Sequence, residues 1–416
     1  MFCTVFEDKA WSAGFSSPAR FMFNCSRKEL NCSYILTANP KEAAPEWNRI
    51  LPEGHPLKGT EILSPGNRNE NMRTMYLLFF QNNACVGLAY LQILTFGRDA
   101  FPTDIFSLKG TEWVKSVLLP EKMSLLICGH IFRLDFSGFF FPDPEKENLL
   151  LPVLADAGRK LPVSHTLMGT LIKDISEASP LFSKTSVGFK IFKDDLVMDL
   201  ALRPNWNSFD DYLGDLSKKY RQRAGKIIQQ ASEIKRMELD LSEIRELEPE
   251  IYRLYEMVLE RQDIRISRLS RTYFSDNKNL RGENFRVFGY FRDDTLCAFS
   301  SHIIKDGGRM ELHYIGFHPA TNEGFALYFN ILFDGLREAI QLKMNTLELG
   351  RTSMDAKANL GATERKLFHL YKVKRGLPSL LFRYLHQKAQ SEGSESRKER
   401  NPLKPQKIHL QPSENG

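Results

Sequence analysis

Three strand-like runs separated by turns lie in the second half of the chain, and they constrain the fold more than any other feature. The runs span 285–291, 296–304 and 309–317, and they are rich in aromatic and β-branched residues, which favour strands. The connecting tetrapeptides, 292–295 and 305–308, supply the Asp and Gly residues that β-hairpin turns favour. The sequence therefore predicts three consecutive antiparallel strands.

An amphipathic helix is predicted directly after these strands. Apolar side chains recur three and four positions apart over 325–340, so they share one helical face. A short strand is predicted at 346–349. The elements predicted ahead of the three strands are a helix, a strand and a second helix, at 208–236, 237–241 and 243–262.

The first half of the chain repeats this order of elements with different residues, which indicates two similar modules. Residues 39–71 are rich in Pro and Gly and predict an irregular loop with one short helical piece. The repeat comprises strands at 75–80, 85–96 and 125–141, a helix at 148–160, an apolar run at 165–175 and a closing strand at 196–202.

Length and composition agree with two modules. A chain of 416 residues exceeds one ordinary domain of about 150 residues, and 42% apolar with 26% charged residues is typical of a globular protein. We therefore predict an α+β fold with two tandem modules, each a mainly antiparallel twisted sheet flanked by helices. The predicted parts are an N-terminal module, a basic connecting helix, a C-terminal module and a disordered tail, at 1–202, 203–236, 237–386 and 387–416.

Charge and cysteine content narrow the class of protein. The six Cys lack CxxC spacing, which favours reduced thiols and no metal site. No run approaches the roughly 18 apolar residues of a membrane helix, so we expect a cytoplasmic protein without a membrane span. The net charge of +6 is too small to indicate nucleic-acid binding. The basic run at 218–226 suits either a solvated helix face or contact with a phosphate-bearing ligand such as tRNA.

Two local sequences carry a family resemblance. Residues 206–213 read WNSFDDYL and resemble the opening of acyltransferase domains in the CelD-like group of the GNAT superfamily. The segment from Glu348 to Ser353, with Lys357 and Gly361-Ala362 downstream, resembles the late strand and loop of that group and of the FemAB-type peptidoglycan aminoacyltransferases. The resemblance implies an N-acyltransferase, with acyl-CoA as the usual donor and an amine as the acceptor. The FemAB alternative implies transfer from aminoacyl-tRNA to a cell-envelope or peptidoglycan precursor.

The turn before the predicted helix at 325–340 departs from the GNAT pattern. GNAT enzymes place a Gln/Arg-x-x-Gly-x-Gly/Ala turn here, whose free N–H groups hold the CoA pyrophosphate. This chain reads HPATNEGF at 318–325, and Glu323 puts a carboxylate where an anion should bind. Asn322 and Gly324 are the remaining cofactor-binding candidates, and the donor stays open between CoA and tRNA.

Acyl transfer to an amine requires a proton acceptor and donors for the developing oxyanion. Strand alternation in 309–317 predicts Glu311 and His313 on one face and Tyr314 on the other, and these three are the catalytic candidates. The alternative is a strand with an ordinary polar outer face.

The loop after the strand at 346–349 supplies the substrate-binding candidates. Arg351 and Lys357 could hold a carboxylate or phosphate, with Ser353 and Asp355 beside them. The alternative is a surface ion pair of Arg351 with Asp355 or Glu348. No nucleophile–base–orienter set is recognisable, so a non-catalytic binding protein that keeps the fold is a third possibility.

Overall fold

The computed structural model describes residues 20–24, 30–59, 62, 71–100, 120–161, 166–183, 188–261, 267–374 and 400–405. They belong to two compact units. Unit 1 takes its residues from 1–195, 260–281 and 366–393, and unit 2 takes the remainder, 196–259, 282–365 and 394–416. Each of the strands β8 (Lys190–Ala201) and β14 (Thr363–Val373) has residues in both units.

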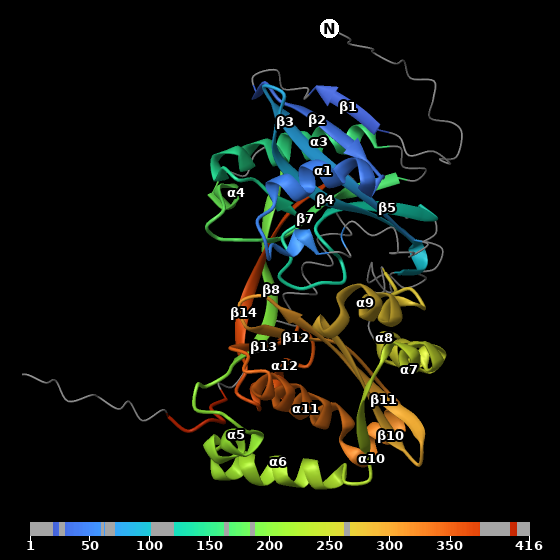
Figure 1. Ribbon diagram of the computed structural model, residues 1–416, viewed down its shortest axis with the longest axis vertical. Helices are drawn as coiled ribbons and strands as arrows, with labels where there is room; N and C mark the ends of the chain where they lie inside the picture. Colours follow the sequence, from blue (N-terminus) through green and yellow to red (C-terminus); the bar gives the residue numbers. More distant parts are fainter. Residues whose placement is uncertain are drawn as a thin grey trace, which may run out of the picture. The chain divides into compact units, whose positions relative to one another are not determined.

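Unit 1 is built on a mostly antiparallel sheet (Figure 1). The strand order is β1, β2, β3, β4, β5, β7, β14, in which β5 and β7 are parallel neighbours connected through helix α3. The strands are β1 (Arg20–Asn24), β2 (Ser33–Thr37), β3 (Met72–Gln81), β4 (Ala84–Gly97), β5 (Lys122–Cys128), β6 (Phe139–Phe140) and β7 (Thr166–Ile175). The helices are α1 (Pro40–Ile50), α3 (Leu150–Lys160), α4 (Pro180–Ser183) and α9 (Tyr273–Arg281).

Alternation along β3 divides the apolar side chains of unit 1 between two cores. Leu77 and Phe79 belong to the core that contains α3, whereas Tyr76 and Leu78 belong to the core that contains Trp47 of α1. Because successive strand residues face opposite sides, helices cover both faces of this sheet.

Helix α1 is longer than the one short helical piece predicted within the irregular loop at 39–71. It runs for 11 residues, and the Asn39 side chain accepts a hydrogen bond from the N–H of Lys41, while Pro40 occupies the first helical position. Asn as the cap and Pro at the first position are both helix-start signals. The run of prolines obscured them in the sequence.

Unit 2 repeats the same plan. Its strand order is β8, β13, β12, β11, β10, β9, in which β12 and β13 are parallel neighbours connected through α11. The strands of this unit besides β8 and β14 are β9 (Lys235–Leu239), β10 (Phe285–Arg292), β11 (Thr295–Lys305), β12 (Arg309–Phe317) and β13 (Thr346–Gly350). The helices are α5 (Phe209–Asp215), α6 (Lys218–Gln230), α7 (Leu241–Glu246), α8 (Glu248–Leu259), α10 (Pro319–Phe325), α11 (Leu327–Gln341) and α12 (Met354–Ala358).

Helices cover both faces of the unit 2 sheet. Met310 and Leu312 of β12 pack in one core with α5, α6 and α11. Helix α8 lies against the other face, where a Cβ on Gly316 would meet the carbonyl carbon of Leu254 at 2.6 Å. Glycine at 316 is therefore required for this close helix–strand contact.

The leading hairpins of the two units share one local design. Asn82 and Asn83 in unit 1, and Asp293 and Asp294 in unit 2, all have positive φ, as a two-residue type I′ turn demands. In both hairpins the register also shifts a few residues before the turn. The predicted α+β fold of two tandem modules is confirmed.

Two predicted helices of unit 2 are divided. The helix predicted at 208–236 ends at Asp215, restarts at Lys218 and gives way to β9 at Lys235. At the break, Leu216 forms an isolated β-bridge with Leu403. The helix predicted at 243–262 is split into α7 and α8, and among the described helices none is long and apolar enough to span a membrane.

Candidate functional site

The parallel ladder of β12 and β13 in unit 2 is short. It joins Arg309–Glu311 to Thr346–Glu348 and ends there, although β12 continues to Phe317. Beyond the ladder, β13 stays paired with β8, with Gly350 opposite Met198. The two strands therefore diverge at Glu311 and Glu348, so the predicted catalytic residues lie where β12 leaves its neighbour.

A β-bulge follows at once on β12. His313 and Tyr314 together face the single residue Ser301 of β11, whose hydroxyl accepts from the N–H of Tyr314 at 3.0 Å. The rings of His313 and Tyr314 consequently meet edge to face, with centroids 4.5 Å apart. The prediction of opposite faces for these two rings is wrong, because a bulge breaks simple alternation.

Glu311 and His313 form a buried pair. His313 Nδ1 lies 2.6 Å from Glu311 Oε1, and each side chain is 1% exposed. The shared face predicted for them is confirmed, while the alternative of a solvent-facing polar strand is wrong. Burial by itself raises the pKa of Glu311, but Lys305 and His313 outweigh it and hold that pKa well below the usual range.

A network of buried charges surrounds this pair. Glu311 and Glu348 are direct neighbours in the ladder, and Lys305 Nζ lies 2.7 Å from one carboxylate and 2.5 Å from the other. Arg309 Nε donates to Glu348 at 2.6 Å and its Nη2 reaches Asp199 at 3.3 Å. Two adjacent buried carboxylates are tolerated here because cations are shared between them.

Lys357 stands apart from this network. Its side chain is 3% exposed, and among the described residues no acid or hydrogen-bond acceptor pairs with its amine. Burial lowers the pKa of Lys357 to about 7, because the interior penalises an unpaired ammonium group. Lys357 therefore makes no direct contact with the Glu311–His313 pair.

The loop that carries Lys357 is held in an unusual backbone shape. Gly350 and Ser353 both have positive φ, at 79° and 54°, and α12 begins directly after Ser353. Arg351 is half-buried between them. The Tyr212 hydroxyl donates to Leu360 O at 3.1 Å, so the two segments that carry the family resemblance meet in space.

The two other predicted substrate-binding residues have protein partners. The Ser353 side chain forms a hydrogen bond with Tyr328, which partly offsets the rise that burial causes in the pKa of Tyr328. Asp355 Oδ1 lies 3.0 Å from Arg400 Nη2. Glu348 is also paired, within the buried network. Both acids that were considered as partners for Arg351 therefore already pair with another cation.

The predicted cofactor-binding turn is a helix, α10. Asn322 Oδ1 accepts from the N–H of Tyr328 at 2.8 Å, in the first turn of α11. Ala326 adopts the left-handed conformation between the two helices, and Gly324 is exposed with no atom within 4 Å of its Cβ position. The Asn322 side chain thus occupies a helix N-terminal donor that a bound anion would otherwise take.

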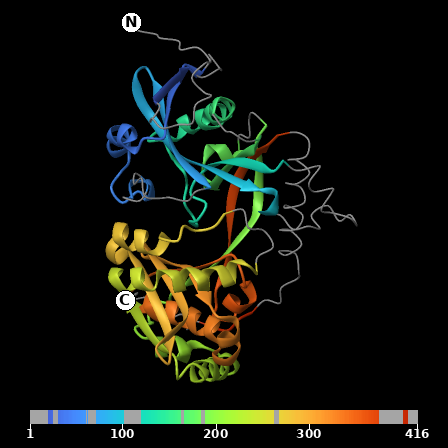
Figure 2. The ribbon, with the colours of Figure 1, turned by 90° about the vertical axis from the view of Figure 1, so that its right-hand side faces the viewer.

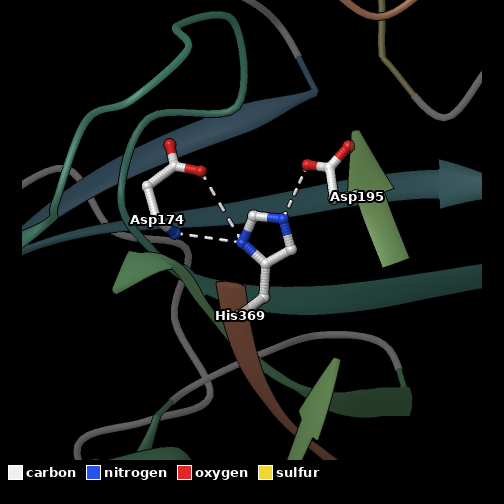
Figure 3. Close-up of side chains that lie close together, drawn as sticks. All are labelled: Asp174, Asp195 and His369. Carbon is white, nitrogen blue, oxygen red and sulfur yellow. Dashed lines mark hydrogen bonds and ion pairs between the residues drawn. The ribbon is translucent and has the colours of Figure 1, made fainter. Parts of the chain in front are cut away.

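A second polar cluster lies in unit 1. Figure 3 shows His369 between two carboxylates, with Nε2 2.7 Å from Asp195 and Nδ1 3.6 Å from Asp174. Figure 2 shows why they meet, since β14 in red lies beside β8 in light green. Nδ1 also accepts from the N–H of Asp174 at 3.0 Å. One ligand atom from each of the three residues lies within 4.8 Å of the others, a spacing that could hold a metal ion. Both ring nitrogens already have hydrogen-bond partners within the protein, so the arrangement suits a held histidine better than a metal site.

Most members of the buried charge network were not predicted as site residues. Lys305 and Arg309 flank a hairpin turn, where cations ordinarily face solvent. Glu311 is near them in sequence, but their other acidic partners, Glu348 and Asp199, come from distant strands, so no local spacing marks most of these pairs. The missed members of the network are Asp199, Lys305, Arg309 and Arg365. Outside the network, Arg400, which pairs with Asp355, was also missed.

Comparison with known proteins finds distant structural similarities. No protein-family model and no curated protein match the sequence. FemX is 12% identical, with a TM-score of 0.46 over 84% of this chain and 98% of that chain. A tandem GNAT protein from the clavulanic acid biosynthesis pathway is 11% identical, with a TM-score of 0.44 over 85% and 98%. The C-terminal domain of a putative lysylphosphatidylglycerol synthetase from Agrobacterium fabrum is 10% identical, with a TM-score of 0.42 over 71% and 84%.

At these identities and TM-scores the likenesses carry no argument about function, which has to be inferred from the residues of unit 2.

Proposed function

We propose that unit 2 is an acyltransferase that moves an acyl group from an activated donor to an amine acceptor. The observation that carries the proposal is Lys357, a buried amine without an acidic partner among the described residues. Structural lysines at such burial are normally paired. An anionic donor, or the oxyanion that develops during transfer, would supply the missing partner and keep the amine charged.

In this proposal the acceptor nitrogen attacks the acyl carbon, and the bond from that carbon to the donor's leaving atom breaks. Arg351 and Lys357 stabilise the negative charge on the carbonyl oxygen or on the donor. His313 takes the proton lost by the acceptor amine, directly or through water. Glu311 orients His313 instead of acting as the base, because a carboxylate with a lowered pKa accepts protons poorly.

The start of α11 favours a donor other than CoA. Asn322 already accepts a hydrogen bond from the first turn of this helix, and Glu323 adds an exposed carboxylate. A pyrophosphate at this helix would have to displace the Asn322 side chain and approach the Glu323 carboxylate. An aminoacyl ester on tRNA needs no such site, so FemAB-like aminoacyl transfer to a cell-envelope amine is the second candidate.

Turnover assays test the proposal. Purified protein is incubated with acetyl-CoA or with aminoacyl-tRNA and a panel of amines, and acylated products are measured by mass spectrometry. Lys357→Met should lower the rate by about 10² to 10³, the usual loss for one oxyanion donor, and Arg351→Ala should also lower it. The exposed Lys235→Met serves as the matched control.

Full activity in a folded Lys357→Met variant would contradict the proposed role. Saturable micromolar binding of acetyl-CoA by calorimetry would count against the tRNA-dependent candidate. Ligand binding without product from any donor would favour the third possibility, a binding protein that keeps the fold.

A further inference from the structure

The segment 400–405 runs across the break between α5 and α6. The N–H of Ser217 donates to Pro402 O at 2.8 Å, and the N–H of Lys404 donates to Asp215 O at 2.8 Å. The Lys404 side chain reaches Gly214 O at 2.6 Å. These contacts form the β-bridge that ends α5, so the disordered tail predicted at 387–416 is wrong for these six residues; the other tail residues lie outside the described part.

Arg400 ties this segment to the loop that carries Lys357. Its Nη1 donates to Asn359 Oδ1 at 2.7 Å, and its Nη2 lies 3.0 Å from Asp355 Oδ1. Asp355 and Asn359 are four residues apart, on one side of the α12 turn, and Lys357 lies midway between them in sequence. One guanidinium therefore holds both ends of this short helix, using the two-branched geometry that lysine lacks.

Leu403 makes the second attachment. A Cβ on Gly361, which has a φ of +99°, would lie 2.8 Å from Leu403 Cδ1, so only glycine leaves room for this side chain. Leu403 also packs against the main core of unit 2. The end of the Lys357 loop is thus covered by an apolar residue from the far end of the chain.

We infer that residues 400–405 form a strap that positions the Lys357 loop, with Arg400 and Leu403 as its positioning residues. The inference rests on the role proposed for Lys357 in acyl transfer. Helix α12 has five residues and no side-chain cap at its N-terminus, so little within it keeps its shape. The strap supplies two charge-assisted contacts and one apolar contact from outside, which hold Lys357 in its buried position.

Chemical labelling of Lys357 tests the strap without any donor. The full chain is treated with a trace of acetic anhydride at a series of pH values, and acetylation of Lys357 is followed by mass spectrometry. Arg400→Ala and Leu403→Asp should each raise the labelling rate by about tenfold or more, because the loop opens more often when these contacts are lost. The pH at which the acetylation rate reaches half its maximum should also move, from near neutral toward the pKa of an ordinary exposed lysine.

Matched variants separate positioning from general damage. Arg245→Ala removes an exposed arginine from α7 and should label like wild type. Leu403→Met keeps the apolar contact and should also behave like wild type. Arg400→Lys keeps the charge but loses one of the two bonds, and it should give an intermediate rate.

Unchanged labelling of Lys357 in both Arg400→Ala and Leu403→Asp would overturn the strap. This outcome is distinct from failure of the proposed function. If Lys357→Met keeps full transfer activity, the proposed catalytic role of Lys357 is refuted. Labelling of Lys357 in the Arg400 and Leu403 variants still reports whether the strap holds the loop.

Discussion

Replacing Lys357 with Met should stabilise the protein while it lowers the proposed activity. Met has a similar length and volume but carries no charge, so it fits the same apolar surroundings without the cost of burying an ammonium group. A residue that costs stability where it stands is typical of a functional site. The pKa of Lys357 gives the size of that cost.

The magnitude follows from the fall of the pKa from 10.5 to about 7. At about 1.4 kcal/mol per pKa unit, the ammonium form is disfavoured in the folded state by about 5 kcal/mol. Between these pKa values the unfolded chain binds the proton and the folded chain does not, so the free energy of unfolding rises with pH. The cost is fully present below pH 7, is about 4 kcal/mol at pH 7, and falls to about 2 kcal/mol at pH 9.

Urea unfolding of wild type and Lys357→Met at pH 7 and pH 9 measures this difference. The free energy of unfolding of the variant should exceed that of wild type by up to about 4 kcal/mol at pH 7 and up to about 2 kcal/mol at pH 9. The difference between the two proteins should therefore shrink by about 2 kcal/mol between these pH values. Lys235→Met, which changes an exposed lysine on β9, should show neither effect. A Lys357→Met variant that is less stable than wild type at pH 7 would refute the reasoning, since it would mean that the amine has a favourable partner.

Substitutions at three further polar residues test their contacts. Glu348→Gln leaves Lys305 with one acid fewer and should lower the free energy of unfolding by about 3–5 kcal/mol in urea; a loss under about 1 kcal/mol would show that the network is dispensable. Asn322→Ala removes the acceptor at the start of α11 and should cost about 1 kcal/mol by thermal unfolding, so an unchanged Tm would contradict the cap. Asp195→Ala leaves the Nε2 hydrogen of His369 without its acceptor and should cost about 1–3 kcal/mol, whereas Asp195→Asn, which keeps an acceptor, should cost less; equal costs would argue against this bond.

Local sequence patterns predict much of the fold. The hairpin of β10 and β11 was predicted because Asp293 and Asp294 favour the left-handed conformation that its turn needs. Helix α11 was predicted from apolar spacing, and its observed start at Leu327 lies two residues from the predicted one. Such features depend on neighbours a few positions away, which a sequence displays directly.

The candidate site was predictable only in part. The shared face of Glu311 and His313 follows from strand alternation, but Tyr314 departs from it because the bulge opposite Ser301 is a property of two paired strands. Glu311 meets Glu348 through a parallel ladder between β12 and β13, two strands that α11 separates in the sequence. Neither the bulge nor the register has a local signature.

The sequence by itself determined the two α+β modules, their leading hairpins and the loop in which Arg351 and Lys357 lie, because turn residues and periodicity act over short distances. The tertiary structure alone decided that Lys357 is buried without an acidic partner among the described residues, and that Arg400 holds its loop. Burial and pairing depend on which distant segments meet in the folded chain, and it is burial that sets the cost of a charge.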